Sequence, residues 1–197
     1  AACPYGHFVC DHCHSADAIE IIKTVCLHSR QTDMAELMQT IRSHHLFRMH
    51  GPEHHSMVPA VILTALRNSG YPVINEEIQA AIERGKTVSG GACAFLGACG
   101  AAIGAGIAIS IILKASPYDG EKRQAVLQIT QAVLARIAAY KAPRCCQRDS
   151  WLALKEITAH IQKQTGKSLK VDTFACDQFL QNKECIHEQC PLWSPGI

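Results

Sequence analysis

Apolar residues recur every three or four positions along most of the chain, a spacing that places side chains on one face of an α-helix. In the clearest stripe, Met34, Leu37, Met38 and Ile41 alternate with polar residues. Residues that favour helix starts or helix ends bound most of these segments. The pattern predicts helices over residues 15–25, 33–45, 51–68, 75–86, 103–113, 121–140 and 149–165.

Strand-like alternation occurs only over residues 169–174, and so short a segment without a pairing partner cannot form a sheet. The sequence has no fixed-period repeat, no low-complexity tract and no linker long enough to divide its 197 residues. We therefore predict an all-α fold: a single compact helical domain over residues 1–197, with cysteine-rich loops at both ends.

The segment from Thr87 to Leu113 carries no charged residue and admits two interpretations. One is a membrane-spanning helix, but Gly90 and Gly91 interrupt the segment, and its strongly apolar part, residues 103–113, is too short to cross a bilayer. The other is a central buried helix, rich in glycine and alanine, whose small side chains let neighbouring helices approach closely. We favour the buried helix and expect no membrane contact.

Charge gives no support for a polyanionic partner, because 19 basic side chains are nearly balanced by 17 acidic ones. We expect no nucleic-acid binding. The unusual components are 11 cysteines and 11 histidines, residue types that bind transition metals. A disulfide framework is the competing interpretation, but the cysteine count is odd and the chain exceeds the size of disulfide-dependent scaffolds. The first residues lack the pattern of a secretory signal, so we expect a reducing, cytoplasmic environment.

Cysteines near the two ends of the chain have the spacing of metal ligands. Cys10 and Cys13 are separated by two residues, as at many zinc and iron–sulfur sites, although a redox dithiol is an alternative. At the other end, Pro191 directly follows Cys190, a feature of ferredoxin cluster loops. The predicted terminal metal ligands are Cys3, Cys10, Cys13, Cys176, Cys185 and Cys190.

A second group of cysteines lies among small residues of the uncharged segment. Cys93 and Cys99 are accompanied by Gly91 and Gly97, whose backbone can approach a wide inorganic cluster and donate N–H bonds to its sulfides. We predict that these four residues help to bind a cofactor. The alternative is that both cysteines pack as small hydrophobic residues in a helix.

Cys145 and Cys146 are adjacent and stand just before a predicted helix. The N–H groups of the helix start, together with Arg144 and Arg148, are expected to lower the pKa of these thiols. Adjacent side chains cannot easily point at one small metal, so we expect one of the pair to bind or react and the other to pack or to serve another site. The sequence leaves open which does which.

Histidines concentrate between residues 44 and 55. His54 and His55 fall in the first turns of a predicted helix, whose positive end favours the neutral imidazole that metal binding or acid–base chemistry needs. Glu53 is a candidate base. Pro59 has no N–H for the carbonyl of His55, so the helix should kink or leave this acceptor free. A solvated histidine-rich turn is the alternative.

The order of the cysteine motifs along the chain resembles that of a known family. The chain contains Cys-Pro-Tyr-Gly-His-Phe-Val-Cys-Asp-x-Cys-His near its start, then Pro-Arg-Cys-Cys-Gln-Arg-Asp and a terminal Cys-Pro-Leu-Trp. Over nearly its whole length it resembles an uncharacterised cysteine-rich domain of anaerobic archaea and bacteria, sometimes found beside S-adenosylmethionine-dependent methyltransferase domains. The resemblance implies an oxygen-poor cytoplasm in which iron–sulfur clusters survive, and it transfers no activity.

A local resemblance concerns residues 90–93 and the Gly/Ala-rich segment after them, which are similar to the Gly-Gly-Cys segment of iron–sulfur serine dehydratases. In those enzymes an iron with an open coordination position acts as a Lewis acid on a substrate hydroxyl. The other dehydratase motifs are missing from this chain, so the likeness is an analogy.

We hypothesise an iron–sulfur protein, holding one or more four-iron four-sulfur clusters, that uses a cluster iron as Lewis acid or redox centre on a small substrate of anaerobic metabolism. It would then be an iron–sulfur-dependent lyase or a redox enzyme. Cys93, Cys99 and one of the adjacent cysteines would surround a central cluster, with His54 or His55 beside it, and the terminal cysteines would form a second, structural site.

The alternative hypothesis is a non-enzymatic metal module. It includes a zinc-stabilised domain, an electron carrier for a redox partner, and a protein that delivers metal to a methyltransferase. Assembly into a homo-oligomer stays open under either hypothesis.

Overall fold

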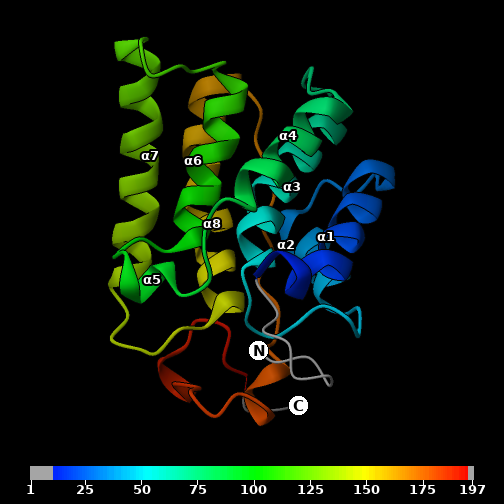
Figure 1. Ribbon diagram of the computed structural model, residues 1–197, viewed down its shortest axis with the longest axis vertical. Helices are drawn as coiled ribbons and strands as arrows, with labels where there is room; N and C mark the ends of the chain where they lie inside the picture. The colour runs from blue at the N-terminus through cyan, green and yellow to red at the C-terminus, as the bar shows by residue number, and fades with distance from the viewer. Residues whose placement is uncertain (1–10, 195–197) are drawn as a thin grey trace.

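The computed structural model describes residues 11–194, with side chains from Asp17 onward, and Figure 1 shows that they form a bundle of helices. The all-α prediction is confirmed, because the described residues hold eight α-helices, two short 3-10 helices and one isolated β-bridge. The α-helices are α1 (Asp11–His28), α2 (Met34–Arg42), α3 (Glu53–Asn68), α4 (Asn75–Gly85), α5 (Ala92–Phe95), α6 (Gly100–Ile112), α7 (Gly120–Ala138) and α8 (Cys146–Thr165), and the 3-10 helices are η1 (Gln178–Leu180) and η2 (His187–Gln189).

Several helix boundaries differ from the sequence prediction for identifiable reasons. Helix α2 ends at Arg42, earlier than expected, because the chain turns there and the N–H of Phe47 bonds to the carbonyl of His44 at 2.8 Å. Helix α8 begins at Cys146, earlier than residue 149, because the N–H of Asp149 already bonds to the carbonyl of Cys145 at 2.9 Å. The short helix α5 was not predicted, since it is only 4 residues long.

Helix α3 is the centre of the bundle. It packs against α1, α2, α4, α6 and α8, and from Glu53 to Leu66 every residue except His55 is buried. Pro59 lies inside this helix, as predicted, and cannot donate an N–H to the carbonyl of His55. A helix enclosed on all sides requires close neighbours, and its partners α4 and α6 supply glycines at the contact.

Two of these glycines flank the carbonyl oxygen of His55. A Cβ atom on Gly85 of α4 would lie 2.6 Å from this oxygen and 2.5 Å from the Cα of Ser56, and a Cβ on Gly104 of α6 would lie 2.9 Å from the Cδ of Pro59. Such distances leave no room for a side chain. The predicted Gly/Ala-rich buried helix is therefore confirmed in α6, and its glycines let it approach the backbone of α3.

Within residues 11–194, no helix combines the length and the apolar character needed to cross a bilayer. The uncharged segment that suggested this alternative instead holds α5, a loop and α6.

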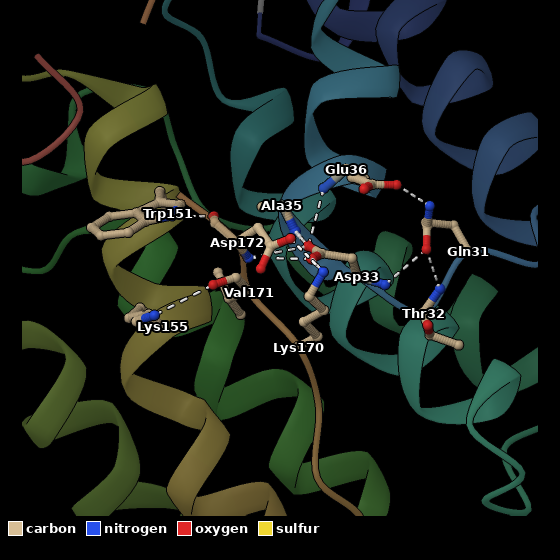
Figure 2. A network of polar contacts seen from close by, with 10 residues as sticks. All are labelled: Gln31, Thr32, Asp33, Ala35, Glu36, Trp151, Lys155, Lys170, Val171 and Asp172. Atoms are coloured by element: carbon tan, nitrogen blue, oxygen red, sulfur yellow. Dashed lines mark hydrogen bonds and ion pairs between the residues drawn. The ribbon is translucent and has the colours of Figure 1, made fainter. Parts of the chain in front are cut away.

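A polar network around Asp33 ties the start of α2 to the chain after α8 (Figure 2). One carboxylate oxygen of Asp33 caps α2 by accepting the N–H of Ala35 at 2.7 Å, and the other accepts the N–H of Asp172 at 3.2 Å. The N–H of Met34 donates to the carbonyl of Lys170 at 3.0 Å, and the ammonium of Lys170 lies 3.6 Å from Asp33. These contacts hold residues 170–172 in an extended strand-like path without a sheet, as the sequence predicted.

The same network reaches α8. The indole N–H of Trp151 donates to the carbonyl of Asp172 at 3.1 Å, and the ammonium of Lys155 donates to the carbonyl of Val171 at 3.3 Å (Figure 2). The chain after Asp172 is thereby led to the end of the bundle where α8 begins, and Figure 1 shows the last described residues there, in orange and red. The N–H of Cys176 donates to the carbonyl of Leu192 at 3.0 Å, which closes this segment into a loop.

Substitution of Gly85 by alanine should destabilise the protein by about 1–3 kcal/mol, because the new methyl group would overlap the backbone of α3. Gly120 is a matched control in the first turn of α7, since a Cβ there has no atom within 4 Å. Gly120→Ala should leave the free energy of unfolding unchanged or raise it by less than about 1 kcal/mol. Urea unfolding followed by circular dichroism measures both, and equal stabilities would contradict the close contact of α4 with α3.

Asp33→Ala removes both the helix cap and the bond to Asp172, so we expect a loss of about 2 kcal/mol in the free energy of unfolding. Asp33→Asn keeps one capping oxygen but places an amide donor opposite the N–H of Asp172. In the same urea experiment, the free energy of unfolding of Asp33→Asn should therefore lie between those of the wild type and Asp33→Ala. A stability of Asp33→Ala within about 0.5 kcal/mol of the wild type would show that the network is dispensable.

Candidate functional site

One end of the bundle brings together residues that are far apart in the sequence. Arg42 at the end of α2, His54 at the start of α3, Gln147 at the start of α8 and Gln178 in η1 all meet there. The C-terminal loop closes over this end (Figure 1). Most of the predicted functional cysteines and histidines lie around it.

Arg42 forms the polar centre of this end, and only 7% of its surface is exposed. Its Nε donates to the Oε1 of Gln147 at 3.1 Å, one terminal nitrogen donates to the Oε1 of Gln178 at 2.5 Å, and another contacts the Nε2 of His54. All three partners are neutral. Within the described part of the chain, no carboxylate forms an ion pair with this guanidinium.

Three thiols lie close enough to Arg42 to influence its charge. Burial lowers the pKa of Arg42, while negative charge on Cys146, Cys145 or Cys176 would raise it again. The amide Nε2 of Gln147 lies 3.1 Å from the Sγ of Cys176, so one glutamine joins the arginine to this thiol. The buried cation is thus surrounded by groups that become anions when they lose a proton.

The thiols form two neighbouring groups. Burial raises the pKa of Cys176 and of Cys190, and negative charge on Cys145 would raise both further. These three cysteines form the group beside the C-terminal loop. The terminal ligands Cys176 and Cys190, predicted for a separate site, therefore lie next to the central Cys145.

The second group lies on the side of α6 and consists of Cys93, Cys99 and Cys146. Burial raises the pKa of Cys99 to about 11, with further contributions from the charges of Asp149 and Cys93. Burial likewise raises the pKa of Cys146 to about 12, with Asp149 adding and an N–H bond from Gly51 opposing. These six thiols therefore converge on one end of the molecule.

The prediction that the start of α8 lowers the thiol pKa of Cys145 and Cys146 is wrong. Desolvation outweighs the helix N–H groups and the charge of Arg148, so the pKa of Cys145 is also raised. At neutral pH these thiols are protonated, and a metal that binds them must displace their protons.

Two cavities adjoin the second thiol group and share Gly91, Cys93, Phe95 and Arg144 in their walls. The larger, of about 650 Å³, extends toward α7 and the start of α8, and the smaller, of about 330 Å³, extends toward α3. The larger cavity is also lined by Gly97, Cys99, Tyr140, Arg148 and Asp149, and the smaller by His50, Gly51, His55 and Cys146.

The loop that carries Cys93 has a shape that glycine makes possible. Gly91 and Gly97 adopt φ values of 78° and 68°, in the left-handed region that disfavours other residues, and they flank α5. Both glycines line the larger cavity. The structure therefore places these predicted residues at the site through their backbone conformation.

The predicted histidine and glutamate residues differ in their surroundings. His55 lines the smaller cavity, and its Nδ1 donates to the carbonyl of Val88 at 3.0 Å. His54 and Glu53 lie behind the cavities, fully buried. Burial, followed by the charge of Arg42, holds the pKa of His54 well below its usual value, so this ring is neutral as predicted.

Glu53 is an unusual buried acid. Both of its carboxylate oxygens are buried without a hydrogen-bond partner, and burial raises its pKa against the opposing charges of Arg48 and Arg42. It does not line either cavity. Its predicted role as a base stays a prediction.

Sequence reasoning missed four residues of this site: Arg42, His50, Gln147 and Asp149. His50 joins the start of α8 to the C-terminal loop, since the N–H of Cys146 lies 3.5 Å from its Nδ1 and the Oδ1 of Asn182 lies 3.4 Å from its Nε2. For Arg42 a signal did exist, because it follows Ala35 and Met38 at helical spacing and so occupies the buried face of α2.

The two thiol groups do not account for every predicted ligand. Cys3 and Cys10 are outside the described residues, as is the side chain of Cys13. Cys185 is half-buried, and its Sγ lies 3.4 Å from the N–H of His187. Among the described side chains, the one group of three potential ligand atoms within 4.8 Å of one another belongs to Asp33, Glu36 and Asp172, where Lys170 already supplies a positive charge (Figure 2).

Comparison with known proteins gives one match. A model of a family of unknown function (DUF5714) covers residues 22–193 of the chain. No curated protein and no solved structure matches it. The match supports the predicted resemblance to an uncharacterised family, while the methyltransferase neighbour and the dehydratase analogy stay predictions.

Thiol labelling tests the described environments. In metal-free, reduced protein near pH 8, iodoacetamide should alkylate exposed Cys93 at least about a hundredfold faster than Cys26, which is fully buried and whose pKa burial raises to about 12. Peptide mass spectrometry after timed quenching gives the two rates. In denaturant the rates should converge, and equal rates in the native protein would contradict the structure.

Proposed function

The chain belongs to DUF5714, a family of unknown function, and we propose from its own residues that it is an iron–sulfur protein. Its thiols around Arg42 would hold a cluster, most simply a four-iron four-sulfur cluster. The two adjoining cavities would admit a small substrate to an iron that is not fully coordinated by cysteine. The protein would then act as a lyase or a redox enzyme in an oxygen-poor cytoplasm.

Arg42 is the observation that carries this proposal. A buried charge without a partner is costly, and the guanidinium has only neutral hydrogen-bond partners among the described residues. A cluster held by thiolates is an anion, and its reduction potential depends on nearby charge and hydrogen bonds. Thiolates at Cys145, Cys146 and Cys176 would compensate Arg42, and Arg42 would stabilise them in return.

A single zinc ion and a cluster need different spacings of their thiolate ligands. A tetrahedral zinc ion with bonds of about 2.3 Å to sulfur needs ligand atoms within about 4 Å of one another. No three described cysteine or histidine side chains approach this arrangement, although the thiols influence one another's charge. A cluster places its own iron and sulfide between the thiolates, so it needs a wider cage.

The chain's own residues supply the rest of the chemistry. When bound, a cluster provides an iron that can polarise a substrate oxygen or exchange an electron. Apolar side chains of α7 line part of the larger cavity and would lower its polarity beside the cluster. His55 lines the smaller cavity, and Asp149, whose pKa burial raises, lines the larger one together with Cys99.

A second candidate function is electron transfer to a protein partner. Phe95 and Leu96 are 86% and 70% exposed, and they follow the exposed Cys93 by two and three residues. An exposed apolar pair beside a redox centre would suit a transient docking contact. Both functions require the same cluster.

Anaerobic purification of the whole chain tests the proposal. We expect a brown protein with stoichiometric iron and acid-labile sulfide. Cys145→Ala and Cys176→Ala should each lose most of both, whereas Cys26→Ala, which alters a thiol buried between α1 and α3, should retain them. Colourless protein with stoichiometric zinc, or full iron and sulfide in both site variants, would refute it.

The role of Arg42 can be tested separately in the same preparation, by iron content and reduction potential. Arg42→Gln should lower the iron content, and in the cluster that remains the reduction potential should become more negative, because a buried positive charge stabilises the reduced form. Arg42→Lys preserves the charge and should retain more iron. Circular dichroism confirms that each variant is folded.

A further inference from the structure

The walls of the larger cavity contain both apolar and charged residues. We call Leu134, Ile137 and Ala138 of α7 the apolar side, and Arg144, Arg148 and Asp149 the charged side. A volume of about 650 Å³ suits a small molecule rather than a macromolecule. A ligand that fits both sides has an apolar body and a polar end.

The two arginines of the charged side are not equivalent. Arg148 is 3% exposed and fully engaged: it lies 2.9 Å from the carboxylate of Asp149, donates to the carbonyl of Pro143 at 3.1 Å and stacks over the ring of Tyr140 at 5.7 Å. Its charge and that of Asp149 cancel. Neither group can bind a ligand ion without losing its present partner.

Arg144 differs from Arg148, because its charge has no partner among the described residues. It is exposed, it lines both cavities where they adjoin, and in the described part of the chain it forms no hydrogen bond or ion pair. A guanidinium in this state offers a planar pair of N–H donors that matches a carboxylate. Among the described residues, the walls of the two cavities therefore hold one free positive charge, at Arg144.

We infer that the site binds a small organic monoanion, with its carboxylate on Arg144 and its apolar body against α7. As a statement about the substrate this rests on the proposed function, because it places the middle of the ligand beside Cys93 and Cys99. A dianion is disfavoured, since the second charge would lie near Asp149 and find no free cation. A neutral ligand of the same shape loses the contact with Arg144.

Hexanoate is a suitable probe, compared with butyrate, with its neutral isostere hexanamide and with succinate. Calorimetry on the anaerobically purified whole chain should give millimolar binding of hexanoate, several-fold weaker binding of butyrate, and no detectable binding of hexanamide or succinate. Arg144→Gln should weaken hexanoate binding at least about tenfold. Arg123→Gln, an exposed arginine in the first turn of α7 outside the cavity walls, should not change it.

A second pair of variants tests the apolar side. Leu134→Trp should fill part of the cavity and abolish the advantage of hexanoate over butyrate. Leu127→Trp lies on the same helix, outside this cavity and half exposed, and should leave the advantage intact. This pair separates the apolar contact from the contact with Arg144.

The outcomes distinguish this inference from the proposed function. Equal binding of hexanamide and hexanoate, unchanged binding in Arg144→Gln, or no saturable binding at tens of millimolar hexanoate would each overturn the inference. Iron and sulfide in the same sample would leave the proposed function standing. Binding that depends on Arg144 in a sample without iron would support the anion site and overturn the iron–sulfur proposal.

Discussion

The enclosure of α3 by five other helices is the constraint on which the rest of the structure depends. A helix with no exposed face gains much from burial, but its neighbours must approach its backbone closely. Gly85 and Gly104 meet this demand at the carbonyl of His55, to which Pro59 cannot donate an N–H. The same enclosure fixes the start of α3, and with it His54 and His55, at the end of the bundle where the thiols converge.

Burial at this end has opposite effects on the two kinds of charge. It keeps the thiols protonated, because a thiolate away from water is unfavourable, and it makes an unpaired guanidinium costly. Loss of the thiol protons would reduce both costs, because the thiolates would compensate the guanidinium and the guanidinium would stabilise the thiolates. A thiophilic metal centre would displace the protons of the thiols that it binds. The burial and charge of this site would therefore suit the anionic cluster that we propose.

The sequence was informative where periodicity and local chemistry decide the structure. The apolar stripes located the long helices, and the small residues after Gly100 predicted the buried helix. It failed where distant segments meet. Nothing near Cys176 reveals that it lies beside Gln147, and the pKa of Cys146 depends on burial by other elements rather than on its position at a helix start. Likewise, helical spacing places Arg42 on the buried face of α2, but its neutral partners come from three other segments.

The Asp33 network has a consequence for the order of events in the cell. It holds the chain after α8 against the start of α2, so the loop that carries Cys176 and Cys190 reaches Arg42 only after residues 170–190 have been synthesised. Helices α1 to α4 can pack while the ribosome is still translating the remainder, since their contacts are local in sequence. The group of thiols around Arg42 cannot form at that stage, because Cys176 and Cys190 have not yet been synthesised. An inorganic centre that needs Cys176 or Cys190 could be bound only after the segment that follows α8 has been made and has folded back onto α2.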